Sequence, residues 1–145
     1  MLIAVDFDAT VVQQGRPYSD LQRPLLLVPG AKSGLVALRA AEHTLFLCSS
    51  RANLALRLDW QLNPLWRAFT PAQIQGWEAS REFHEARYQQ MLQFVPIALP
   101  GIFAAVDDGR QGKVLADLFI DDKAQRFGAR GLLWEQIAAT WGVQT

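Results

Sequence analysis

The chain has 145 residues, half of them hydrophobic and 19% charged, and this length and composition predict one folded domain and exclude an intrinsically disordered protein. Lys plus Arg and Asp plus Glu balance at 14 each, so the zero net charge argues against long-range electrostatic binding of nucleic acid and leaves self-association as a homo-oligomer open. The single cysteine, Cys48, cannot form a disulfide within the chain. With no signal peptide and no apolar run of membrane length, we expect a cytoplasmic protein without membrane partners.

The first half of the chain alternates strand and helix patterns. Leu2–Val5 is a continuous apolar run of strand length, as in a parallel strand buried on both faces. Residues 13–29 carry a glycine and several prolines, which predict a loop with room for a short β segment. Leucines at helical spacing predict a helix over 31–42, and the run TLFLCSS predicts a second buried strand over 44–50. Another helix is predicted over 51–63.

The second half continues the alternation. Thr70 followed by Pro, Ala and Gln is typical of a capped helix start and predicts a helix over 70–94. Apolar runs predict strands over 101–106 and 116–120, and a helix is predicted over 131–142. Strands that alternate with helices indicate an α/β fold with a mainly parallel sheet.

Each predicted strand ends in residues that can bind phosphate or a metal ion. In an open parallel sheet the carboxyl ends of all strands meet at one edge, where ligands bind. We therefore expect these residues to gather around one site. In chain order they are Asp6 and Asp8, then Ser49, Ser50 and Arg51, then Asp107 and Asp108, and finally Asp121 and Asp122, with Lys113 in the loop before the last strand.

The chemistry of this set favours phosphoryl transfer. Asp6 and Asp8 are two residues apart, so on an extended backbone their side chains point to one side. Facing carboxylates need a cation, and Mg²⁺, a hard ion that prefers oxygen ligands, fits best, with Asp121 as a further ligand. Carboxylates, a lysine and a hydroxyl together suit phosphoryl transfer better than hydride or acyl chemistry.

Four segments resemble the motifs of the haloacid dehalogenase-like (HAD) superfamily, most members of which are Mg²⁺-dependent phosphohydrolases. They are DFDAT (6–10), the serine in LFLCSSR (45–51), Lys113, and LFIDD (118–122). The resemblance covers nearly the whole chain in the same order. It implies a Rossmann-like three-layer sandwich and a small, capless or minimally capped phosphatase.

The resemblance also implies roles for single residues. Asp6 would be the nucleophile that forms an aspartyl-phosphate, and Asp8 would be the general acid and then the general base. Ser49 would donate a hydrogen bond to the phosphoryl oxygens and Lys113 would neutralise their charge. Thr10 would help fix the turn after the nucleophile.

The implied metal site uses Asp6, the backbone carbonyl of Asp8, and Asp121, with Asp122 as an outer ligand or orienting group. One departure from the family pattern is Ala9, which stands where a glycine is usual. A second open point is the phosphate-binding serine. Ser50 is a rival for Ser49, although the order hydroxyl, small residue, arginine favours Ser49.

Arg51 is a candidate for contact with a second anionic group of the substrate.

Domain organisation follows from the spacing of the motifs. We expect one domain over 1–145 with at most a small helical insert over 64–100, and therefore an open site. The substrate class stays undefined by the sequence: a phosphorylated small molecule, such as a sugar phosphate or a nucleotide, or a polynucleotide end.

Two alternatives use similar residues. A receiver-like signalling domain also has an acidic pair, an aspartate that accepts phosphate, a hydroxyl and a lysine at strand ends. In receivers the acidic pair precedes and the lysine closes the set, whereas here the order is DxD, serine, lysine, DD, which favours the phosphatase. A catalytically inactive HAD-like binding or scaffold protein is disfavoured by the complete motif set.

Overall fold

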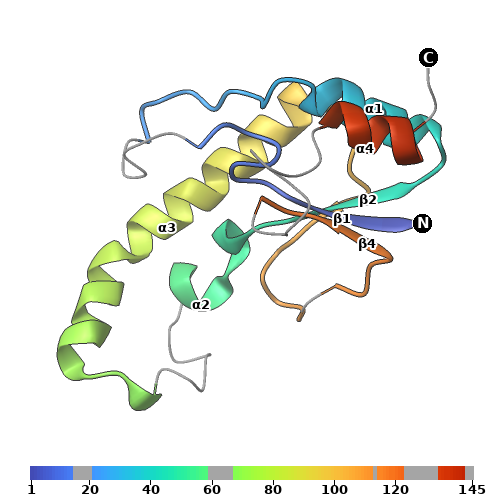
Figure 1. Ribbon diagram of the computed structural model, residues 1–145. Coiled ribbons are helices and arrows are strands. Elements are labelled where there is room, and N and C mark those ends of the chain that lie inside the picture. Colours follow the sequence, from blue (N-terminus) through green and yellow to red (C-terminus); the bar gives the residue numbers. More distant parts are fainter. Residues whose placement is uncertain (15–20, 59–66, 113, 123–133, 143–145) are drawn as a thin grey trace.

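The computed structural model describes residues 1–14, 21–58, 67–112, 114–122 and 134–142. Four strands form a sheet in the order β3-β2-β1-β4, and every pair of neighbours is parallel. The α/β class and the parallel sheet are thereby confirmed (Figure 1). The strands are β1 (Leu2–Asp6), β2 (Thr44–Cys48), β3 (Ala105–Val106) and β4 (Leu118–Ile120).

The helices are α1 (Ala31–Ala40), the short η1 (Ser50–Ala52) and α2 (Leu54–Arg57), the long α3 (Pro71–Ala98) and α4 (Trp134–Trp141). Helices η1 and α1–α3 fall between strands and α4 follows β4, in the predicted order. None of the helices in the described ranges combines the length and the apolarity that a membrane span requires.

The core lies between β1, β2 and the helices. Ile3 is in register with Leu45 and Val5 with Leu47, and all four side chains are fully buried together with the leucines of α1. Each such burial contributes roughly 1.5–3 kcal/mol, so the central strands are held firmly. Their carboxyl ends, which carry the candidate site residues, are therefore rigid supports.

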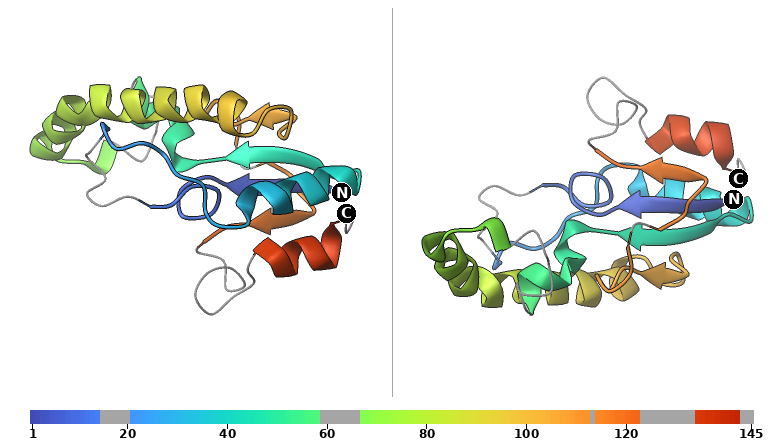
Figure 2. Two further views of the ribbon diagram at one scale, coloured as in Figure 1. Left: turned by 90° about the horizontal axis from the view of Figure 1, so that it is seen from above. Right: turned by 90° about the horizontal axis from the view of Figure 1, so that it is seen from below.

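Helices α1 and α4 lie side by side on the sheet, and α1 crosses one of its faces (Figure 2). Their close approach depends on Gly34, because a Cβ there would stand 2.8 Å from the indole of Trp134. The Trp134 side chain is 1% exposed, so the contact anchors α4 to the core.

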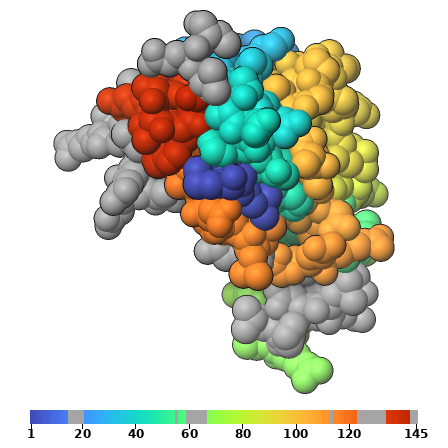
Figure 3. All heavy atoms as spheres, turned by 90° about the vertical axis from the view of Figure 1, so that its right-hand side faces the viewer, coloured from blue at the N-terminus to red at the C-terminus, as the bar shows by residue number. Residues whose placement is uncertain are grey.

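Polar contacts close the amino-terminal edge of the sheet, which is opposite the carboxyl ends of the strands. The backbone N–H of Leu2 donates to Asp117 at 2.7 Å, and His43 lies 3.3 Å from the N-terminal amine and 2.7 Å from the carbonyl of Trp141. Figure 3 shows the start of the chain in dark blue, surrounded by α4 in red and by neighbouring segments in teal and orange.

Helix α3 begins with the predicted cap. The Thr70 hydroxyl accepts from the backbone N–H of Gln73, and the Gln73 side chain accepts from the backbone N–H of Thr70. Its first half extends away from the sheet (Figure 1), and its second half packs on the core through Tyr88, Met91 and Val95. The predicted insert over 64–100 is thus mainly one long helix, and residues 64–66 lie outside the described ranges.

Several predicted boundaries are wrong. The strand expected over 101–106 is reduced to β3, because Gly101 has a φ of +69° and the N–H of Ile102 bonds back to Leu99 in the turn that follows α3. The helix expected to stop near residue 94 continues through Pro96 to Ala98. The helix expected over 51–63 is divided into η1 and α2, and residues 59–63 lie outside the described ranges, as do 131–133 of the predicted last helix.

Candidate active site

A cavity of about 1120 Å³ opens at the carboxyl ends of the strands. The floor is the sheet face that carries Ala4, Phe46 and Phe119, and the polar residues are at the strand ends. The predicted convergence of the strand ends is therefore observed for the described residues. The polar lining includes Asp6, Asp8, Ser49, Ser50, Asp107, Asp108, Asp121 and Asp122.

Three carboxylates gather at one end of this cavity. Oxygen atoms of Asp6, Asp121 and Asp122 lie within 4.8 Å of one another. Burial, and secondarily the charge of Asp121, raises the pKa of Asp6 to about 7. A half-buried carboxylate among like charges keeps a proton or pairs with a cation, and carboxylate oxygens are donors of the kind that Mg²⁺ prefers. We call these residues the carboxylate cluster.

The turn after β1 is tied to both Asp6 and α4. The buried Thr10 donates its hydroxyl to Asp6 at 3.5 Å, and its carbonyl accepts from the indole N–H of Trp134 at 2.9 Å. Ala9 has a φ of 61°, in the left-handed region that favours glycine. The local backbone therefore has the shape that a glycine would adopt without strain.

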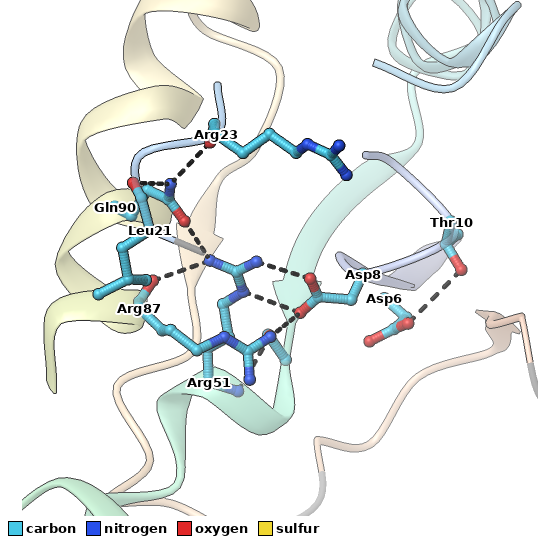
Figure 4. Close-up of polar contacts among 9 residues, drawn as sticks. Asp6, Asp8, Thr10, Leu21, Arg23, Arg51, Arg87 and Gln90 are labelled. Atoms are coloured by element: carbon cyan, nitrogen blue, oxygen red, sulfur yellow. Dashed lines mark hydrogen bonds and ion pairs between the residues drawn. The ribbon is translucent and has the colours of Figure 1, made fainter. Parts of the chain in front are cut away.

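Asp8 is not a member of the carboxylate cluster, so the expected pairing of the Asp6 and Asp8 carboxylates around one cation is not found. The Asp8 side chain turns toward arginines instead (Figure 4). Arg51 donates to its two oxygens at 2.7 and 2.8 Å, in a bidentate pair, and Arg87 of α3 lies 3.6 Å from one of them. The side chains of Arg51 and Asp8 are only 5% and 19% exposed. Arg51 is thus bound to Asp8 in this structure, and its predicted contact with substrate stays a prediction.

The two serines after β2 differ in their surroundings. Ser49 is 8% exposed, and its hydroxyl oxygen accepts from the backbone N–H of Arg51 at 3.1 Å, which leaves the hydroxyl hydrogen able to donate to an anion. Ser50 is exposed at the start of η1.

Burial, and then the charge of Asp107, raises the pKa of Cys48 to about 11, so this thiol is a neutral member of the cavity wall and a poor nucleophile.

Lys113 lies outside the described residues. Its neighbours Gly112 and Val114 both line the cavity. The predicted charge-neutralising role of Lys113 therefore stays a prediction.

The aspartates after β3 form a turn. Asp107 accepts from the backbone N–H of Gly109 at 2.8 Å, and Asp108 accepts from that of Arg110 at 2.9 Å. The φ of Gly109 is +75°, and a Cβ there would collide with the Ala52 carbonyl at 1.6 Å. Both aspartates thus shape the wall of the cavity through the turn that they cap.

A second buried arginine, Arg57, stabilises this turn. Arg57 lies over the Tyr88 ring at 3.6 Å and donates to the carbonyl of Asp108 at 2.9 Å, while the Tyr88 hydroxyl donates to the carbonyl of Asp107. Arg57 also pairs with Glu85 at 3.1 Å. This cluster joins α2, α3 and the turn after β3, and it does not include Asp8.

Sequence reasoning missed the contribution of α3. Arg87 and Gln90 stand 36 and 39 positions from Arg51, yet they place a carbonyl and an amide oxygen against its guanidinium, both at 3.0 Å. Gln14, Asn53 and Arg87 also line the cavity beyond Asp8. No motif or spacing marks these residues, because an arginine or glutamine in a polar helix is usually solvated.

Comparison of the chain with protein-family models, with curated proteins and with solved structures finds no match in any of the three. The functional argument therefore depends on the residues and the geometry of the site.

Proposed function

We propose that the protein is a Mg²⁺-dependent phosphohydrolase that cleaves phosphomonoesters through an aspartyl-phosphate on Asp6. The observation that carries this proposal is the convergence of Asp6, Asp121 and Asp122 at the carboxyl edge of a parallel sheet, with Ser49 and Asp8 lining the same cavity. The order of the motifs and the shape of the turn at Ala9 support a HAD-like fold, a three-layer sandwich without a large cap.

In the first step a carboxylate oxygen of Asp6 attacks phosphorus in line. The new O–P bond forms as the bond to the leaving oxygen breaks. Asp8 enters this step in its protonated form, with a proton taken from solvent, and gives that proton to the leaving oxygen. In the second step Asp8 takes a proton from water, the water oxygen attacks phosphorus, and the Asp6 carboxylate leaves with its bonding electrons. Ser49 donates to the phosphoryl oxygens throughout.

Asp6, Asp121 and Asp122 would hold the Mg²⁺ ion. Bound there, the ion supplies charge neutralisation for the phosphoryl group and for the three carboxylates. Burial above all raises the pKa of Asp6, so Asp6 alone holds a proton up to near neutral pH. A cation held beside it would favour the ionised form that can act as nucleophile.

The cavity suits a polar leaving group. In-line attack sends the leaving oxygen away from Asp6, and Gln14, Asn53 and Arg87 line the same cavity. A sugar phosphate, a nucleotide or a polynucleotide end carries hydroxyl and anionic groups that these side chains can bind.

One assay separates the proposal from its rivals. Purified protein is given para-nitrophenyl phosphate with Mg²⁺, with EDTA, and as the Asp6→Asn variant. We expect turnover that EDTA abolishes and that Asp6→Asn lowers by at least about 10⁴-fold. Stable phosphorylation without sustained release of phosphate would indicate a receiver-like domain. No turnover on a broad panel of phosphomonoesters would indicate a binding protein.

A further inference from the structure

The guanidinium of Arg51 uses its donors in two directions. Nε and one terminal nitrogen donate to the two oxygens of Asp8, and the other terminal nitrogen donates to the Arg87 carbonyl and to the Gln90 amide oxygen, each at 3.0 Å. The group also lies 5.1 Å from the centre of the Phe7 ring. Because the planar guanidinium donates hydrogen bonds on both sides, it has one orientation. It therefore fixes the orientation of the carboxylate that it binds.

Gln90 links this guanidinium to a further segment. Its amide nitrogen donates to the carbonyls of Leu21 and Arg23, at 3.4 and 3.5 Å, while its oxygen accepts from Arg51 (Figure 4). Helix α3 therefore supports Asp8 through Arg51, although neither Arg87 nor Gln90 belongs to the four segments that resemble a phosphatase.

We propose that Arg51 is a positioning residue for Asp8, and that α3, through Gln90 and the carbonyl of Arg87, is the element that aims it. The proposal rests on the proposed function, in which Asp8 moves the proton. The buried Arg51 acts through Asp8 and contributes to turnover by keeping that carboxylate in line with the leaving oxygen. Its loss then lowers kcat more than it raises KM, because the ground-state contacts of the phosphoryl group are elsewhere.

The test is a double-mutant cycle on turnover of glycerol 2-phosphate with Mg²⁺, because an alkoxide leaving group needs the proton that Asp8 supplies and para-nitrophenolate does not. We expect Asp8→Asn to lower kcat by about 10³-fold and Arg51→Gln to lower it by about 10²-fold, the loss typical of a misplaced catalytic group. If Arg51 acts through Asp8, the double variant loses about 10³-fold, whereas independent effects would multiply to about 10⁵-fold.

Arg57→Gln is the matched control. Arg57 is also a buried arginine paired with a carboxylate and bound to a main-chain carbonyl, but its partners are Glu85 and Asp108. Whatever loss of activity or stability this variant shows, that loss should multiply with the loss from Asp8→Asn. A general effect of a removed buried charge is thereby separated from positioning of Asp8.

Two milder variants cover the case in which Arg51→Gln does not fold. Arg51→Lys keeps the charge but not the bidentate fork, and Gln90→Leu removes one support of the fork. Each should lower kcat by about 10-fold in the wild-type background and have almost no effect in the Asp8→Asn background.

Two results overturn the proposal, and they are distinguishable. Turnover by the wild type together with multiplicative losses in the cycle overturns the role of Arg51 and leaves the phosphatase function intact. Absence of turnover by the folded wild type overturns the proposed function, and the positioning role falls with it.

Discussion

Asp6 and Asp8 follow the same strand two residues apart, and their surroundings have opposite charge. Asp6 faces two more carboxylates within 4.8 Å, whereas Asp8 lies between the guanidiniums of Arg51 and Arg87. The surroundings of Asp6 are therefore acidic, and those of Asp8 are basic. Under the proposed function, one sequence motif would yield two chemical roles. Asp6 would be a metal ligand and nucleophile and Asp8 an oriented acid–base group, because tertiary contacts place different partners beside the same kind of side chain.

The largest expected effects come from neutralising Asp6 and Asp8 one at a time. The two variants should change the free energy of unfolding in opposite directions. Asp8→Asn should lower the free energy of unfolding by about 2 kcal/mol, because it leaves the buried guanidinium of Arg51 without its carboxylate. Asp6→Asn should raise the free energy of unfolding in metal-free buffer at about pH 8, because it removes one charge from the carboxylate cluster. Urea denaturation in EDTA measures both values. Equal signs for the two variants would contradict the contrast between Asp6 and Asp8.

The pH dependence of stability sharpens the contrast at Asp6. Burial and the neighbouring carboxylates raise the pKa of Asp6 from 3.8 to about 7, so between these values the folded state keeps a proton that the unfolded state has lost. The contribution of Asp6 to stability is therefore present at low pH and is lost as the pH rises toward about 7.

Saturating Mg²⁺ should therefore raise the melting temperature more at about pH 8 than at about pH 5. Thermal denaturation of the wild type and of Asp6→Asn, each with Mg²⁺ and with EDTA, isolates the part that belongs to Asp6. The same Mg²⁺ effect at both pH values, or an unchanged effect in Asp6→Asn, would show that the cation does not bind at the carboxylate cluster.

The smallest expected effect concerns Ala9, in the turn that follows β1. Ala9 has a φ of 61°, a conformation that glycine adopts without the steric cost borne by alanine, so Ala9→Gly should stabilise the protein by up to about 1 kcal/mol. The control is the same substitution at Ala79, an exposed position of α3, where glycine should cost about 1 kcal/mol. Chemical denaturation distinguishes the two signs. Destabilisation by Ala9→Gly would mean that the turn is not strained.

Local sequence predicted the elements whose pattern lies within a few residues. The apolar runs of β1 and β2 and the cap at Thr70 occur where they were expected, because burial on both faces and capping are read from neighbouring residues. The first part of the strand expected over 101–106 was wrong because it depends on distant residues. Its apolar side chains follow a turn at Gly101, and pairing with β2 begins only at Ala105, which the local apolar pattern does not reveal.

The sequence by itself determined that Asp6, Asp121 and Asp122 would meet, because parallel strands bring their carboxyl ends to one edge whatever the details of packing. Only the tertiary structure decided the partner of Asp8. That partner is Arg51, oriented by a carbonyl and an amide from α3 that stand 36 and 39 positions away. A side chain on a strand end can turn toward either side of a cavity, and the balance of charge and hydrogen bonds from distant segments selects the side.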